Sequence, residues 1–186
     1  MTDQPPKRKT ISVYTDGSST GAALGPIGMG WLVTDWEDII TAGSEGGPVG
    51  TNNIAELQAA ISGLRAVIDR KLHIGNDVEL VSDSQYTLNL ADCTYKANAN
   101  KDIVKILQKL FAEAGAVKRW VRGHSGDIFN DKVDELAKAG RDRYAPVESR
   151  KRRRTRKRDE RRRKRAIVKA YKERVYGTRN VLGRIL

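Results

Sequence analysis

Cysteine is almost absent from this chain, which has one, Cys93, among 186 residues. A single cysteine excludes an internal disulfide and a zinc site built from several cysteines. It favours an intracellular, cytoplasmic setting, nucleoid-associated or, in a eukaryote, nuclear. Long apolar runs are also absent, so we expect neither a membrane partner nor a secretory signal at the polar N-terminus. No glycine-rich stretch has the spacing of a nucleotide-binding loop.

Charge is unevenly distributed along the chain. Residues 1–140 contain 15 Lys and Arg against 18 Asp and Glu, a net charge of −3, whereas residues 141–186 contain 20 against 5, a net charge of +15. We therefore expect an acidic body with a basic tail that binds nucleic acid. The expected organisation is a disordered lead at 1–9, a globular domain at 10–142, a linker at 143–149 and a basic, largely helical extension at 150–186.

Alternating and helical patterns predict an α/β fold. Hairpin-linked strands are expected at 10–16, 27–34 and 39–44, the last ended by Gly46-Gly47-Pro48, and further strands at 78–83 and 116–121. Helices are expected from Thr51 or Asn52, at 84–90, around 103–114 and at 131–141. Helical crossovers make the first, fourth and fifth strands parallel, in a five-stranded mixed sheet with helices on both faces.

Four carboxylates are expected near one edge of this sheet. Asp16 and Asp83 end two parallel strands, and such ends meet at one edge. Glu56 lies one turn into the first helix, and Asp134 lies in the first turn of the last helix. Carboxylates gathered in this way repel one another, which raises their pKa values unless a cation neutralises them.

Hard divalent cations with oxygen ligands, Mg²⁺ or Mn²⁺, suit such a group of carboxylates. Two ions roughly 3.5–4 Å apart would clamp the attacking and leaving oxygens of a phosphoryl displacement. The alternative is that acidic residues, of which the chain has 23, occupy these positions by chance. Taken alone, Asp16 could simply cap a turn, because Asp-Gly is a common turn pair.

Four motifs in the expected order resemble type I ribonuclease H. They are Tyr14-Thr15-Asp16-Gly17-Ser18, residues 51–57, residues 82–86, and residues 120–126 followed by Asn130 and by Asp134-Glu135-Leu136-Ala137. The resemblance covers residues 10–141. It implies an endonuclease that hydrolyses the RNA strand of RNA–DNA hybrids with two Mg²⁺ ions, or Mn²⁺ as a substitute, through attack by metal-bound water. The products would carry 5′-phosphate and 3′-hydroxyl ends.

The resemblance also implies roles for individual residues. The metal-binding catalytic carboxylates would be Asp16, Glu56, Asp83 and Asp134, with Asp16 shared by both ions. His124, on a loop between two glycines, would move protons or help product leave, which suits a side chain that titrates near neutral pH. A loop histidine bonded to water is the alternative for His124.

The substrate contacts implied by the resemblance are Gly17, Ser18, Thr51, Asn52, Gln85 and Asn130. Neutral side chains and backbone groups can contact phosphates and base edges, and contacts to the 2′-hydroxyl distinguish RNA from DNA. Thr51 and Asn52 are also good helix caps, and this alternative stays open.

The chain departs from the family pattern between the middle helices. Many type I enzymes carry a basic, Trp-bearing protrusion there, whereas residues 88–101 contain two lysines, no Trp and no insertion. We expect the basic tail to bind the hybrid in place of the protrusion, through contacts to phosphates. The residues concerned are Arg152, Arg153, Arg154, Arg156, Arg158, Arg161, Arg162, Arg163 and Arg165. A solvated charged helix or a targeting signal are the alternatives for the tail, and the apolar C-terminus could dock on the body or on a protein partner.

Two other functions stay open. The first is a non-catalytic protein of the same fold that binds nucleic acid or helps to assemble a ribonucleoprotein. The second is a transposase, an integrase or a structure-specific DNA nuclease. A site without catalysis has no physical reason to keep four like charges together, which argues against the first alternative. Cleavage assays on hybrid, duplex DNA and duplex RNA would separate the second from a hybrid nuclease.

Overall fold

The computed structural model describes residues 8–21, 24–144, 158–159, 161–162 and 165–166. The chain divides into two compact units, Met1–Ala145 and Pro146–Leu186. In the second unit the described residues are helical and exposed, and they include Arg158, Arg161, Arg162 and Arg165. The basic, largely helical extension at 150–186 stays a prediction. The predictions for Arg152, Arg153, Arg154, Arg156, Arg163 and the apolar C-terminus lie outside the described residues.

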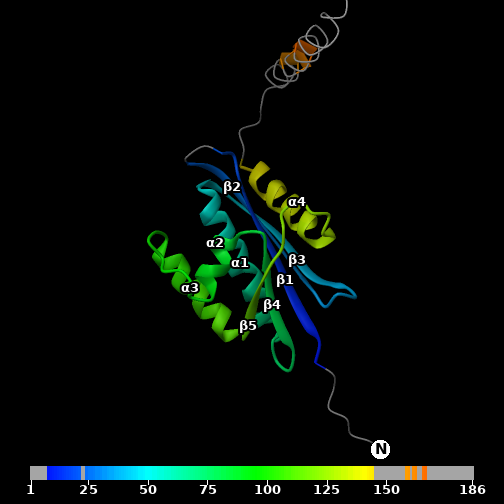
Figure 1. Ribbon diagram of the computed structural model, residues 1–186, viewed down its shortest axis with the longest axis vertical. Helices are drawn as coiled ribbons and strands as arrows, with labels where there is room; N and C mark the ends of the chain where they lie inside the picture. Colours follow the sequence, from blue (N-terminus) through cyan, green and yellow to red (C-terminus); the bar gives the residue numbers. More distant parts are fainter. Residues whose placement is uncertain (1–7, 22–23, 145–157, 160, 163–164, 167–186) are drawn as a thin grey trace, which may run out of the picture. The chain divides into compact units, whose positions relative to one another are not determined.

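The first unit contains one mixed sheet with the strand order β3-β2-β1-β4-β5 (Figure 1). β1 (Thr10–Ser19), β2 (Gly25–Thr34) and β3 (Ile39–Gly50) are antiparallel neighbours. β4 (Asp77–Ser82) pairs in parallel with β1, and β5 (Ala116–Trp120) pairs in parallel with β4. The predicted five-stranded mixed sheet is therefore confirmed, and the first and fourth strands are adjacent.

Helices cover both faces of this sheet, as predicted. α1 (Asn52–Asp69), α2 (Gln85–Ala91) and α3 (Lys101–Glu113) lie on one side, and α4 (Ile128–Asp142) lies on the other (Figure 1). Successive residues of β1 therefore enter different cores: Val13 belongs to the cluster that contains Leu57 of α1, and Tyr14 packs with Val133 of α4. None of the described helices is both long enough and apolar enough to cross a membrane.

Three strands are longer than predicted: β2 begins at Gly25 rather than at residue 27, and β1 and β3 extend further at their ends. β1 does not end at Asp16, because Asp16 pairs with Gly30 and the antiparallel pairing with β2 continues to Ser19. β3 does not end at residue 44, because Gly46 pairs with Gly28 and the strand runs to Gly50. Glycine and proline did not break this strand because it lies at the edge of the sheet, where a proline needs no ladder partner.

The last helix begins earlier than predicted. Asp127 caps it, since Oδ1 of Asp127 accepts hydrogen bonds from the backbone N–H groups of Phe129 and Asn130 at 3.0 and 3.1 Å. The helix therefore starts at Ile128 rather than at residue 131, and Asp134 lies in its second turn. Boundaries set by a single capping side chain are hard to predict, because several polar residues in this loop are suitable caps.

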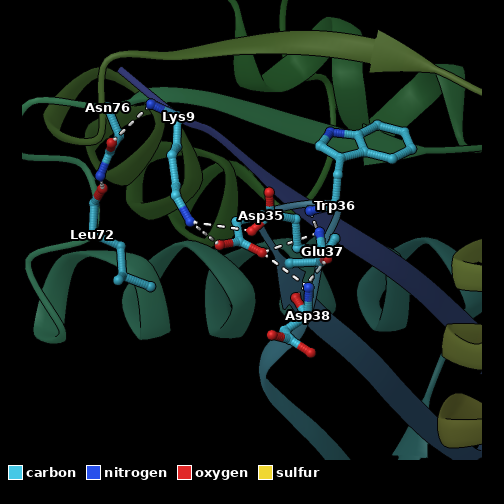
Figure 2. Close-up of polar contacts among 8 residues, drawn as sticks. Lys9, Asp35, Trp36, Glu37, Asp38, Leu72 and Asn76 are labelled. Atoms are coloured by element: carbon cyan, nitrogen blue, oxygen red, sulfur yellow. Dashed lines mark hydrogen bonds and ion pairs between the residues drawn. The ribbon is translucent and has the colours of Figure 1, made fainter. Parts of the chain in front are cut away.

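Lys9 differs from the expectation of a disordered lead at residues 1–9. Its ammonium group bonds Oδ2 of Asp35, in the turn between β2 and β3, at 2.8 Å, and its backbone N–H bonds Oδ1 of Asn76 at 3.1 Å (Figure 2). The chain is thus tied to two turns immediately before β1 begins. Residues 1–7 of the expected lead lie outside the described residues.

Close contacts through glycine hold α4 against the sheet. A Cβ atom added to Gly30 of β2 would lie 2.2 Å from the backbone oxygen of Val133, and one added to Gly140 of α4 would lie 1.8 Å from that of Glu45. These distances leave no room for a methyl group at either position. The glycines therefore allow helix and strand backbones to touch, which sets the position of every side chain on α4.

We predict that Gly30→Ala lowers the free energy of unfolding by about 2 kcal/mol or more, because α4 must move away from β2. Gly47→Ala, in the neighbouring strand, is the matched control, since its Cβ would lie 3.5 Å from Ile27 in ordinary contact. Urea unfolding followed by circular dichroism measures both. Equal stabilities for the two variants would contradict the close contact at Gly30.

Candidate functional site

Asp16 and Asp83 lie at the same end of the parallel pair β1 and β4. The last residue pair that the two strands share is Tyr14 with Val81, so Asp16 and Asp83 both follow where the parallel pairing ends. Glu56 comes from α1, and Gly17 brings it close: a Cβ atom at Gly17 would lie 2.4 Å from the backbone nitrogen of Glu56. The glycine after Asp16 therefore lets β1 touch the helix that carries the third carboxylate.

The three carboxylates converge. One oxygen from each of Asp16, Glu56 and Asp83 lies within 4.8 Å of the other two. Glu56 is buried; its Oε1 accepts a hydrogen bond from Nδ2 of Asn52 at 3.3 Å, but its Oε2 has no hydrogen-bond partner in the described part of the chain. A buried carboxylate oxygen without a partner is costly, and a bound cation would satisfy it. The donor set fits a hard divalent metal ion.

Burial and mutual repulsion change the acidity of these groups. Burial, followed by the charges of Asp83 and Asp134, raises the pKa of Asp16 to about 7. Burial also raises the pKa of Glu56 well above its usual range, with Asp16 and Asp83 contributing. Burial raises the pKa of Asp83 as well, although the nearby His124 opposes this shift. The site therefore favours protonation or cation binding over three bare charges at neutral pH.

Asp134 lies beside the other carboxylates but not in their group of three. Its charge raises the pKa values of Asp16 and Asp83, which places it nearby. Its Oδ2 accepts a hydrogen bond from Nζ of Lys138, one turn further along α4, at 2.5 Å. The structure thus brings together three of the four predicted carboxylates, and the fourth is paired with a lysine at the margin of the site.

His124 lies on the exposed loop between β5 and α4. His124 and Gly126 have left-handed backbone conformations, with φ of 53° and 85°. The loop lies against Asp83, because a Cβ atom at Gly123 would be 2.5 Å from Oδ2 of Asp83. The indole N–H of Trp120 also bonds the backbone oxygen of Asp83 at 3.0 Å. The predicted catalytic histidine is therefore next to the carboxylates.

The predicted substrate contacts have varied environments. Thr51 caps α1, since its hydroxyl accepts from the N–H of Ile54 at 3.3 Å, and the capping alternative is thus confirmed for this residue. Asn52 bonds Glu56 instead, and Gln85 is exposed at the start of α2.

Gly17 lies against α1, as described above, and Ser18 and Asn130 are buried. The Ser18 hydroxyl accepts a hydrogen bond from Nη1 of Arg141 at 2.8 Å, so it is bound within the protein. Oδ1 of Asn130 is a second buried oxygen that has no partner among the described residues. Three residues that bond elements of the site were not predicted from the sequence: Asp127, Trp120 and Lys138. Of these, only Asp127 could have been found from a local pattern, because an aspartate three positions before Asn130 is a suitable helix cap.

Comparison with known sequences points to one family. A family model described as RNase H matches residues 8–142. The ribonuclease H of Sulfurovum sp. (strain NBC37-1) is 34% identical over 143 residues, which cover 73% of this chain and 92% of the relative. The ribonuclease H of Legionella pneumophila (strain Lens) is 35% identical over 144 residues, which cover 70% and 95%. The basic tail lies outside the residues that the family model matches.

Solved structures give the same fold. RNase H1 from the halophilic archaeon Halobacterium salinarum NRC-1 superposes with a TM-score of 0.62 at 25% identity, covering 72% of this chain and 98% of that one. LC11-RNase H1, solved in complex with an RNA/DNA hybrid, superposes with a TM-score of 0.63 at 24% identity, covering 73% and 99%. At such identity the likeness to the second structure shows the fold alone.

We predict that Asp16→Asn stabilises the protein in EDTA, and more so at pH 8 than at pH 5. Because the pKa of Asp16 is raised from 3.8 to about 7, the folded protein binds the proton more tightly than the unfolded chain. Stability therefore falls as the pH rises through this window, and the asparagine avoids the decrease. We expect a gain of about 1–3 kcal/mol at pH 8, measured by urea unfolding.

Asp69→Asn, at the exposed end of α1, is the matched control and should show no such pH dependence. A variant Asp16→Asn that is no more stable than the wild type at pH 8 would contradict the raised pKa of Asp16 in the folded protein.

Proposed function

The chain belongs to the ribonuclease H family, and from this premise we propose that it hydrolyses the RNA strand of RNA–DNA hybrids in a metal-dependent reaction that leaves 5′-phosphate and 3′-hydroxyl ends. The observation that carries the proposal is the convergence of Asp16, Glu56 and Asp83 within 4.8 Å. Relatives named ribonuclease H support it, as does a neighbour of the same fold that was solved with an RNA/DNA hybrid.

Two Mg²⁺ ions, or Mn²⁺ in their place, would be held by Asp16, Glu56, Asp83 and Asp134. Bound there, they would supply the positive charge that stabilises the attacking and leaving oxygens of phosphoryl transfer. Two observations support this assignment: the raised pKa values of Asp16 and Glu56, and Oε2 of Glu56, which has no hydrogen-bond partner among the described residues. Asp134 joins the site only if its carboxylate exchanges Lys138 for a metal ion.

Other residues of the site act on the substrate and on protons. The exposed imidazole of His124, next to Asp83, would exchange a proton with the scissile phosphate or the departing product. The backbone of Gly17 and the amides of Asn52 and Gln85 would contact the 2′-hydroxyls that distinguish RNA from DNA. Thr51 would contact a phosphate while it caps α1. Asn130, whose buried oxygen lacks a partner among the described residues, would stand next to the reacting group.

A non-catalytic nucleic-acid-binding or ribonucleoprotein assembly protein of the same fold is the second candidate. The carboxylates argue against it, because a group of like charges with raised pKa values destabilises a fold that makes no use of it. Among the described residues, Asp134 forms an ion pair with Lys138, whereas Asp16, Glu56 and Asp83 form none.

We predict that Asp83→Asn abolishes Mg²⁺-dependent cleavage of a labelled RNA–DNA hybrid and removes Mg²⁺ binding in calorimetry, while circular dichroism stays unchanged. The amide has the shape of the carboxylate but lacks the charge that holds the ion. Asp69→Asn, far along α1, is the control and should retain both activities.

Duplex RNA and duplex DNA are tested beside the hybrid in the same assay. Preference for either of them over the hybrid would contradict the proposed substrate, and full turnover by Asp83→Asn would contradict the metal-dependent mechanism.

The basic tail is proposed to add affinity for nucleic acid that does not depend on base sequence. Residues 1–140 have a net charge of −3, so the tail holds most of the positive charge available to phosphates. Among its described residues, Arg158, Arg161, Arg162 and Arg165 are exposed on helical segments, as phosphate contacts require. The apolar C-terminus is proposed as a site for a protein partner.

We predict that truncation after Tyr144 weakens hybrid binding and makes the dependence of log K on log salt less steep, by about 0.9 for each phosphate that the tail neutralises in the full chain. The rate of cleavage at saturating substrate should be retained, since the carboxylates remain. Filter binding at several salt concentrations measures the effect. Unchanged affinity and slope would assign the tail to another partner.

A further inference from the structure

Arg119, Tyr14 and Asp127 form a hydrogen-bonded chain that none of the proposed roles uses, and Tyr14 precedes Asp16 by two residues on β1. The guanidinium of Arg119 donates to the Tyr14 hydroxyl oxygen at 3.0 Å, and the Tyr14 hydroxyl donates to Oδ2 of Asp127 at 3.5 Å. Strand register makes the first contact possible, because Tyr14 pairs with Val81 and Val81 pairs with Arg119. The chain therefore links β1, β5 and the start of α4.

Arg119 is held on several sides. Its Nε donates to Oε2 of Glu79 at 2.7 Å, and its guanidinium lies 5.3 Å from the centre of the Tyr14 ring and 5.1 Å from that of Trp36. Trp36 has a left-handed backbone, and its N–H donates to the Thr34 hydroxyl at 3.0 Å. An arginine with an ion pair and two ring faces has little freedom to move.

Figure 2 shows how the turn that carries Trp36 is fixed. Asp35 accepts hydrogen bonds from the backbone N–H groups of Glu37 and Asp38 at 3.2 and 3.0 Å, while its other oxygen bonds Lys9. The indole of Trp36 points away from this ion pair (Figure 2). These hydrogen bonds hold the turn in place, and the turn holds the Trp36 ring against Arg119.

Asp127 uses its two oxygens differently. Oδ1 caps α4, while Oδ2 faces the hydroxyl of Tyr14. α4 carries Asn130 and Asp134, two of the residues assigned to the reaction. Because Tyr14 is wholly buried on the central strand, its hydroxyl is a fixed point for the first turn of α4.

The His124 loop, residues 121–126, is held between two anchors. At its start, Val121 bonds the backbone oxygen of Ser82 at 3.1 Å, and the indole of the preceding Trp120 bonds that of Asp83. Its end is Asp127. Between them lie the two left-handed residues, and a non-glycine residue such as His124 keeps that conformation only when its surroundings hold it there.

We propose that Arg119, Tyr14 and Asp127 are positioning residues, which hold the His124 loop and the first turn of α4 in the geometry that the reaction needs. This inference rests on the proposed function. The network does not touch Thr51, Asn52 or Gln85, the substrate contacts on α1 and α2. Breaking it therefore lowers kcat and leaves KM unchanged, which separates it from a role in substrate binding.

Tyr14→Phe and Asp127→Asn test the proposal on the full chain with a hybrid substrate. The first keeps the buried ring, which lies 5.3 Å from that of Phe129, and removes only the hydroxyl. The second keeps a good helix cap and removes only the charge. We expect each to lower kcat about 10-fold with KM within twofold of the wild type. The double variant should be no slower than the slower single variant, because both changes break one contact.

Tyr95→Phe, which removes an exposed hydroxyl elsewhere, should leave kcat unchanged. Amide hydrogen exchange provides a readout without activity: in Tyr14→Phe we expect faster exchange at residues 121–127 and unchanged exchange in α1. Unchanged kcat in both single variants, multiplying effects in the double variant, or a rise in KM alone would overturn the positioning role. Unchanged exchange in the loop would also overturn it. A wild type that does not cleave the hybrid would overturn the proposed function instead.

Discussion

Like-charged carboxylates are held together in this protein by the backbone, against their own repulsion. Asp16 and Asp83 follow the last shared pair of two parallel strands, and Gly17 lets α1 approach closely enough to add Glu56. No basic side chain bonds these three carboxylates among the described residues. The free energy that offsets this repulsion must come from the cores on the two faces of β1, where Tyr14 and Val13 are wholly buried. A cation that binds there removes the repulsion that the scaffold sustains.

The position of α4 connects the fold to the chemistry. Gly30 and Gly140 let this helix lie directly on the sheet, and its first turn is tied by Asp127 to Tyr14 on the central strand. Because α4 is fixed by these glycine contacts and by the bond at its first turn, the position of Asp134 relative to Asp16 is fixed as well. There Asp134 forms an ion pair with Lys138, one turn further along α4.

Under the proposed function, the body and the basic tail both bind nucleic acid, but through different groups. The body has a net negative charge over residues 1–140; its neutral Asn52 bonds Glu56, and its neutral Gln85 is exposed two residues after Asp83. Neutral contacts can distinguish sugars without competing with metal ions for the carboxylates. The positive charge is concentrated in residues 141–186, where it can bind phosphates without lowering the charge of the site.

The sequence by itself determined the α/β class and the order of the elements, because alternation and helical spacing are local patterns. It also predicted that the carboxylates of Asp16, Glu56 and Asp83 lie close together, because their places along the predicted strands and helix can be located from local patterns. Only the tertiary structure decided where β1 and β3 end, that Ser18 is bound by Arg141, and that Asp134 is paired with Lys138. It also decided the contact between Arg119 and Tyr14, which are 105 positions apart. Such contacts depend on strand register and helix packing, and these are set by the whole core rather than by neighbouring residues.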